Sequence, residues 1–109
     1  MSGDKANLLD MLEGARAIQT FLAEAVFDDL VADRKLRSAD LYELTVIGEA
    51  VKRLSTGFRT RNPEIDWKSI AGLRDVITHG YDVVDLGEIW WIVPTDLPGL
   101  IEFLESKLK

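Results

Sequence analysis

Four polar side chains near residue 75 have types and spacings that suit acid–base chemistry on a phosphate. Arg74 lies five residues before His79, the only histidine in the 109-residue chain, and Tyr81 lies two residues after it. Asp75 precedes His79 by four residues, so on a helix the two side chains are close enough to touch. A histidine with an ordinary pKa of about 6.5 transfers protons near neutral pH, and an arginine stabilises charge on phosphate oxygens. The pattern predicts one helix that presents these four side chains along one flank.

The stretch around these residues has the features of an amphipathic helix. Asp66 is a suitable N-cap, because its carboxylate can accept from the unpaired N–H groups of a first helical turn. Apolar residues then recur every three or four positions, the spacing of a buried stripe, at Trp67, Ile70, Leu73 and Ile77. Gly80 and the β-branched Val83 and Val84 predict that the helix frays or bends just after His79.

The spacing of Arg74, His79 and Tyr81, written R-x-x-x-x-H-x-Y, resembles the signature of the HepT-like branch of the HEPN superfamily. Further landmarks of that family are similar in order, and the resemblance runs from about Phe27 onward. They are the run Ile47-Gly48-Glu49-Ala50, Pro63 followed by Trp67, then Trp90 and the turn Asp96-Leu97-Pro98. The resemblance implies an all-α, antiparallel up-and-down helical bundle that forms a homodimer.

The resemblance also implies a function. Proteins of this kind are metal-independent RNA endonuclease toxins whose composite active site lies at the homodimer interface. Each is neutralised by a minimal nucleotidyltransferase antitoxin, which adenylylates the motif tyrosine, here Tyr81. An alternative within the superfamily is a non-catalytic helical module that only docks a nucleotidyltransferase, and the acidic composition suits it.

Elementary chemistry agrees with a metal-independent ribonuclease. If the 2′-hydroxyl attacks its own phosphate, RNA cleavage needs only proton transfer and charge stabilisation. A single histidine supplies either the acid or the base, so two chains meeting at their motif helices would supply both, with Asp75 orienting His79. With one histidine and no cysteine, the sequence predicts no metal site, and without a glycine-rich phosphate loop it predicts no cofactor.

Composition and charge limit the class of protein. The length suits one domain, residues 1–109, and the absence of cysteine, signal peptide and transmembrane run predicts a cytoplasmic protein. A net charge of −6 argues against nonspecific nucleic-acid binding. Two basic clusters soften that argument, Lys52 to Arg61 and Arg34 to Arg37. They are either solvated helix faces or phosphate contacts; the second interpretation predicts RNA binding by Arg53, Arg59, Arg61 and Lys68.

Helical periodicity also predicts the remaining elements, and no segment alternates like a strand. Ser2 or Asp4 caps a first helix, Phe27–Ala32 forms a short one, and a long helix runs from about Asp33 to Thr56. Residues 60–65 form a loop, Pro94 ends or kinks a helix that starts at Leu86, and Thr95 or Asp96 caps the last helix. The long helix is expected to bury Ala39, Tyr42, Val46, Ala50 and Leu54, together with Ile47 and Val51.

For two features of the predicted helices, the sequence allows both a structural and a functional role. Glu49 sits among apolar residues, so it is either an anchor for an arginine or part of the site. Trp90 and Trp91 point about 100° apart on a helix, so one of them faces outward, either into a homodimer interface or against a neighbouring loop.

Overall fold

Residues 2–80 and 83–109 are described by a computed structural model; Met1, Tyr81 and Asp82 lie outside these ranges. Within them the chain forms seven helices and no strand, which confirms the all-α prediction. The helices are α1 (Ser2–Leu22), α2 (Phe27–Ala32), α3 (Arg34–Arg53), α4 (Thr56–Arg61), α5 (Trp67–His79), α6 (Leu86–Thr95) and α7 (Leu97–Lys107). In the described part of the chain, every helix is too short or too polar to cross a membrane.

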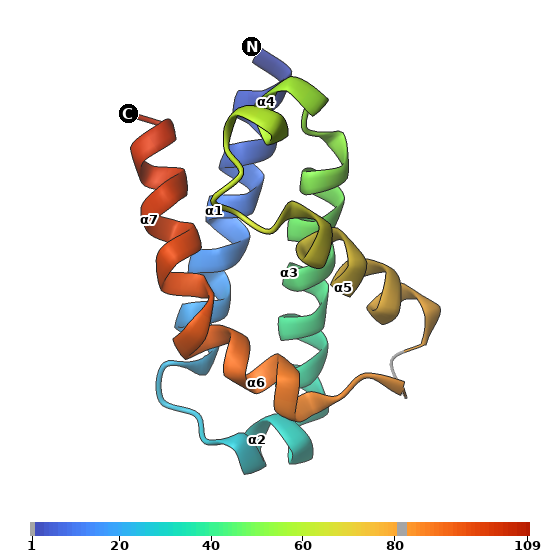
Figure 1. Cartoon of the computed structure of the whole chain (residues 1–109). Coiled ribbons are helices and arrows are strands. Elements are labelled where there is room, and N and C mark those ends of the chain that lie inside the picture. The colour runs from blue at the N-terminus through green and yellow to red at the C-terminus, as the bar shows by residue number, and fades with distance from the viewer. Residues whose placement is uncertain (1, 81–82) are drawn as a thin grey trace.

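The core of the bundle is formed by α1, α3 and α7. Helix α1 packs against both others and runs opposite to them (Figure 1). Their facing sides bury apolar residues completely, among them Met11, Ile18, Leu41, Val51 and Leu104. Burial of such side chains stabilises a fold by roughly 1.5 to 3 kcal/mol each, so these three helices form a firm base for the rest.

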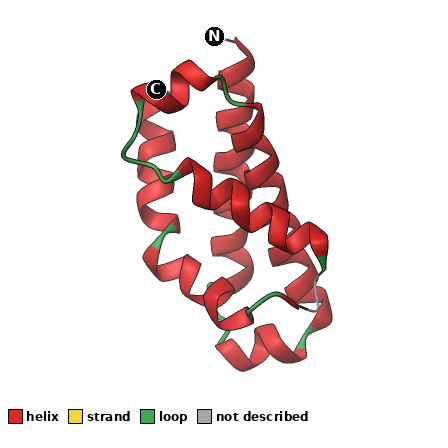
Figure 2. Cartoon of the chain, turned by 45° about the vertical axis from the view of Figure 1, so that its right-hand side comes forward, coloured by secondary structure: helices red, strands yellow, loops and turns green. Residues whose placement is uncertain are grey.

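Helix α5 lies obliquely across the outside of this base (Figure 2). It packs mainly on α3, and its far end extends away from α1 and α7 (Figure 1). Only one side of α5 is therefore covered: Trp67 and Ile77 are buried as predicted, whereas Ile70 and Leu73 are half-buried. The other side remains open along its length.

A buried carboxylate fixes the corner between α3 and α4. Asp4 accepts hydrogen bonds from the backbone N–H of Ser55 at 2.8 Å and from its hydroxyl at 2.7 Å. These bonds lower the pKa of Asp4, so the carboxylate is ionised at neutral pH. The prediction that Ser2 or Asp4 caps α1 is wrong, because the helix already begins at Ser2, and the Asp4 carboxylate holds a distant corner instead.

Three boundaries and one buried face differ from the sequence expectations. The long helix α3 ends at Arg53, and Ser55 caps a separate helix α4 that covers part of the expected loop. Helix α6 continues through Pro94 to Thr95, because a proline in the last turn removes only one N–H bond. Tyr42 is 61% exposed rather than buried, since the inward face of α3 is turned toward Asp40, Leu41 and Leu44.

Asp40 is the unusual member of this inward face. It is 1% exposed, and neither carboxylate oxygen has a hydrogen-bond partner among the described residues. Burial raises its pKa to about 7. The unfolded chain loses this proton near pH 3.8, so between these values the folded protein binds more protons than the unfolded chain. The free energy of unfolding should therefore fall as the pH rises from 4 to 7.

The Asp40→Asn variant should lose this part of the pH dependence, because an amide has no proton to release. Urea unfolding at about pH 5 and pH 8 measures it: relative to Asp40→Asn, the wild-type protein should lose about 2 to 3 kcal/mol between the two. Asp28→Asn, on the exposed face of α2, is the control and should behave as wild type. Equal pH dependence in wild type and Asp40→Asn would contradict the assignment.

Candidate active site on α5

The first turn of α5 is fixed by side chains on both sides of the preceding loop. Asp66 caps the helix as predicted, accepting from the N–H of Ser69 at 3.0 Å and from its hydroxyl at 2.7 Å. The indole N–H of Trp67 donates to the carbonyl of Asn62 at 2.9 Å, and its ring packs edge-on against Phe58 and Phe103. The start of the motif helix is therefore held by α4, its loop and α7.

The middle of α5 approaches α3 closely at Gly48. A Cβ atom at this position would lie 2.3 Å from Cβ of Arg74 and 3.2 Å from the backbone oxygen of Ile70. The first distance is shorter than real Cβ atoms allow and the second is tighter than most real contacts, so glycine is what permits this approach. Gly48 thus sets the depth at which the motif helix sits on α3.

At this contact Arg74 enters an ion-pair network formed by Glu49, Lys52, Arg53, Arg74 and Asp75. Its Nη2 donates to Glu49 at 3.0 Å and its Nη1 to Asp75 at 3.1 Å. Lys52 donates to the same Asp75 oxygen at 2.5 Å, and Arg53 lies 3.6 Å from Glu49. The sequence left open whether Glu49 anchors an arginine or belongs to the site. In the structure it anchors an arginine, and that arginine is Arg74 of the motif.

The network keeps Arg74 charged and, among the described residues, leaves some of its N–H groups without a partner. The hydrogen bond from Arg74 lowers the pKa of Glu49, and hydrogen bonds from Lys52 and then Arg74 lower the pKa of Asp75. Both acids are therefore ionised at neutral pH. Three cations against two carboxylates leave one net positive charge. A guanidinium has five N–H groups; the two contacts use one on each Nη, and the Nε–H is shielded from solvent, so the second N–H of each Nη is what Arg74 can offer to a phosphate.

His79 is the last residue of α5, and it is exposed to solvent. Arg74 turns toward α3, about 140° around the helix axis from His79, so the two side chains of one chain do not share a face. Within the described residues His79 has no hydrogen bond to Asp75, whose carboxylate contacts Lys52 and Arg74 instead. The expected Asp75–His79 pair is not formed in this chain alone. Tyr81, the predicted modification site, lies outside the described residues.

The four residues predicted to bind RNA lie in three different places. Arg59 of α4 and Lys68 of α5 both line a groove of about 970 Å³ between these helices, called here the α4–α5 groove. Arg53 belongs to the ion-pair network. Arg61 is exposed on α4 and is not part of the groove wall.

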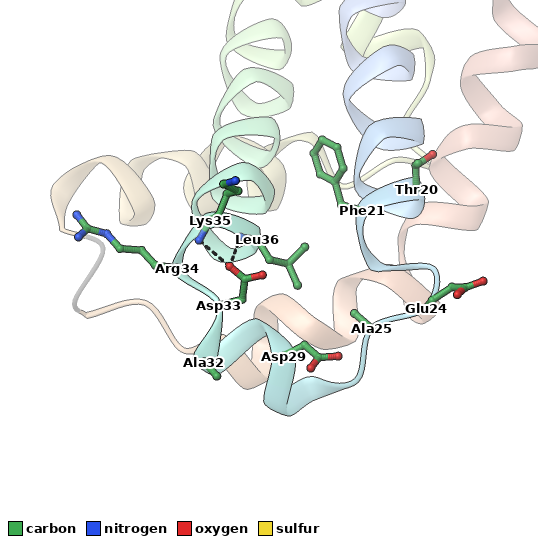
Figure 3. A pocket seen from close by; sticks show the side chains of 10 residues that line it. All are labelled: Thr20, Phe21, Glu24, Ala25, Asp29, Ala32, Asp33, Arg34, Lys35 and Leu36. Carbon is green, nitrogen blue, oxygen red and sulfur yellow. Dashed lines mark hydrogen bonds between the residues drawn. The ribbon is translucent and has the colours of Figure 1, made fainter.

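The second basic cluster, Arg34 to Arg37, belongs to the far end of the bundle. Arg37 donates to the carbonyls of Leu30 and Val31, so it caps α2 rather than binding a ligand. A hollow of about 780 Å³ lies beside it, between the end of α1, α2 and the start of α3 (Figure 3). Two of the three acids there have structural roles: Asp33 caps α3, and Asp29 accepts from the N–H of Val26. The polar side chains of this hollow do not form an arrangement suited to catalysis.

Sequence reasoning missed the roles of Gly48 and Lys52. Gly48 stands in the run that resembles the family, but its function depends on the distance between two helices, which no spacing along the chain reveals. Lys52 was noted only as part of a basic cluster, although it is the first hydrogen-bond partner of Asp75. Its position three residues after Glu49, on the same helix face, is the signal that could have identified it.

The fold and the site define an all-helical protein whose Arg–His motif is carried on a helix anchored by ion pairs. The family model described as "Ribonuclease HepT-like" matches residues 11–106. The chain belongs to this HepT-like ribonuclease family, as its motif indicated. No solved structure matches the chain significantly.

Named relatives agree with the family. A candidate RNase of Methanocaldococcus jannaschii is 37% identical over 105 residues, covering 96% of this chain and 87% of its own. The probable ribonuclease HepT of Thermococcus cleftensis is 36% identical over 96 residues, covering 88% and 87%. A candidate RNase of Caldanaerobacter subterraneus is 40% identical over 93 residues, covering 82% and 83%.

Gly48→Ala should destabilise the protein by about 1 to 3 kcal/mol, because the new methyl group forces α5 away from α3. Elsewhere in a helix the same change stabilises by up to about 1 kcal/mol, so the expected sign is the reverse of the usual one. Thermal unfolding measures the effect. Gly14→Ala is the control: its methyl group meets the flexible side chain of Ile47 at 3.1 Å and should cost less. A Gly48→Ala protein as stable as wild type would contradict the close-contact assignment.

Proposed function

We propose that the chain is a metal-independent endoribonuclease that acts as the toxin of a toxin–antitoxin pair. The observation that supports this most is the state of Arg74, which is held by Glu49 and Asp75 yet keeps N–H groups for a phosphate. A purely structural ion pair would not need an exposed histidine one turn further along the same helix. Membership of a family described as ribonucleases supports the same chemistry.

The proposed reaction is an internal transesterification of RNA. A histidine acting as base removes the proton of a 2′-hydroxyl, whose oxygen attacks the adjacent phosphorus. A new P–O2′ bond forms while the P–O5′ bond breaks, and an acid protonates the departing 5′ oxygen. The products are a 2′,3′-cyclic phosphate and a 5′-hydroxyl end. Arg74 stabilises the negative charge that gathers on the non-bridging oxygens.

The acid and the base of this reaction come from two chains of a homodimer. One chain has one histidine, its Arg74 points about 140° away from it around the helix, and its Asp75 is held by Lys52 and Arg74, so a second copy would complete the site. Exposed apolar side chains near the motif helix support such an interface: Val76 is 48% exposed, Trp91 62% and Val83 70%. Trp90 packs on Phe27, so the outward tryptophan is Trp91.

The groups that are present support the proposed metal independence. The nucleophile belongs to the RNA, and Arg74 supplies the positive charge that a metal ion would otherwise bring. We expect the ribonuclease to cut RNA without any added ion.

The proposed regulation acts through Tyr81. A minimal nucleotidyltransferase antitoxin would transfer an adenylyl group from ATP: the phenol oxygen bonds to the α-phosphorus, pyrophosphate leaves, and the phenol proton goes to solvent. Tyr81 follows His79 by two residues in the sequence. The added phosphate would repel the RNA backbone and compete for Arg74, which would silence the enzyme.

His79→Ala should abolish RNA cleavage, by at least about 100-fold, and leave the thermal unfolding midpoint unchanged, because the side chain is exposed. The assay is cleavage of single-stranded RNA in EDTA, with detection of the cyclic phosphate product. A substrate with a 2′-deoxy sugar at the cut site is the control and should resist cleavage. Full activity of His79→Ala would contradict the chemistry, and no activity in the wild type would leave the non-catalytic docking module as the better account.

Tyr81→Phe should remain as active as wild type toward RNA but escape silencing by the nucleotidyltransferase and ATP, because it lacks the acceptor oxygen. Intact-mass spectrometry and RNA cleavage, before and after this treatment, measure both effects. Tyr42→Phe, an exposed tyrosine on α3, is the matched control and should gain the adenylyl mass normally. Adenylylation of Tyr81→Phe, or its silencing to the same extent, would overturn the assignment.

A further inference from the structure

We infer that the α4–α5 groove binds a nucleotide of the RNA strand a few positions from the bond being cleaved, and so forms a substrate subsite. This inference rests on the proposed ribonuclease function. The groove is bounded by α4, the loop that follows it, and the open side of α5. Its volume of about 970 Å³ is of the size that binds small organic ligands.

The groove leads toward the proposed reaction centre. Lys68, Gly72, Asp75 and His79 are separated by four, three and four residues, so they lie along one side of α5. Lys68, Gly72 and Asp75 line the groove. Gly72 is about 10 Å from His79 along the helix axis, a distance that about three stacked nucleotide steps span when each rises about 3.4 Å. An RNA strand cut at His79 would therefore pass over this groove.

The walls offer donors for a phosphate and a base. The Nε–H of Arg59 is shielded from solvent without a hydrogen-bond partner among the described residues. Lys68 is exposed, and Thr56 and Thr60 add hydroxyl groups. A guanidinium can also stack on a base, which suits single-stranded RNA.

The three carboxylates around the groove do not prevent this use. Asp66 is occupied by the N–H and hydroxyl of Ser69. Asp75 is neutralised by Lys52 and Arg74. Glu64 is exposed beside the groove, and its single charge stands against the two cations Arg59 and Lys68.

Gly72 provides an independent observation. A Cβ atom there would meet nothing within 4 Å, so packing within the chain does not require glycine. Glycine inside a helix nevertheless costs about 1 kcal/mol relative to alanine. Gly48 on the facing helix has a steric reason to be glycine, whereas Gly72 has none within the described chain. Its missing side chain instead leaves the floor of the groove open for a ligand.

The variant Gly72→Leu tests the subsite, because it fills the groove without touching the fold. Its unfolding midpoint should equal or exceed that of wild type, since leucine forms helix better than glycine. The measurement is kcat/KM for a single-stranded RNA heptamer and for a dinucleotide that spans only the cut bond. The ratio of heptamer to dinucleotide should fall about tenfold in Gly72→Leu, as expected for losing one bound nucleotide. Gly3→Leu, another exposed helical glycine with open space around it, should keep the wild-type ratio.

The outcomes separate the subsite from the function on which it rests. If the wild type cleaves neither RNA, the proposed ribonuclease function fails. If the wild type cleaves both and Gly72→Leu keeps the full ratio, the subsite is overturned and the function stands. If Gly72→Leu keeps the ratio but resists silencing by the nucleotidyltransferase, the groove docks that protein, and the RNA assignment is overturned.

The variant Lys68→Gln tests the phosphate contact. The slope of heptamer affinity against salt concentration, on logarithmic scales, should become shallower by about one phosphate contact, and an unchanged slope counts against the subsite.

Discussion

The contact between Gly48 on α3 and the backbone of α5 at Arg74 is the constraint on which the site depends. Because Gly48 has no side chain, α5 lies close enough for the guanidinium of Arg74 to reach Glu49, the next residue along α3. The same closeness brings Lys52 to Asp75. Two neighbouring residues thus set the distance between the helices and the direction of the motif arginine. Exposed ion pairs are individually weak, so the glycine contact, rather than the charges, fixes the geometry.

This arrangement leaves the motif helix with one packed side and one open side. The packed side holds Arg74 in a network with one net positive charge, and the open side carries His79 at its end and the α4–α5 groove near its start. A helix held in this way is rigid where it must orient an arginine and accessible where RNA must bind. It also separates arginine from histidine within one chain. A second chain is the simplest way to bring the two functions to one phosphate.

The sequence predicted the helices well, because their caps and apolar periods are local. Asp66, Asp33 and Asp85 cap helices through neighbours two or three residues away, and Trp91 is exposed beside the half-buried Trp90. The misses all depend on distant contacts. Asp4 was expected at a helix start, yet it holds Ser55, fifty-one residues away. Tyr42 was expected to be buried but is exposed, while Asp40 is buried, because the inward face of α3 is decided by three neighbouring helices. Asp75 was expected beside His79, but Lys52 and Arg74 hold its carboxylate.

The central claim is that each active site takes one histidine from each of two chains. Wild-type protein equilibrated with a ninefold excess of His79→Ala measures it, with RNA cleavage expressed per wild-type chain. If both histidines are needed, mixed dimers are inactive, and random pairing lowers this activity about tenfold. A ninefold excess of a variant that keeps His79 but is changed on the far end of the bundle, such as Arg34→Gln, should cause no such loss. Cleavage per wild-type chain that stays constant in the His79→Ala mixture would contradict the composite site.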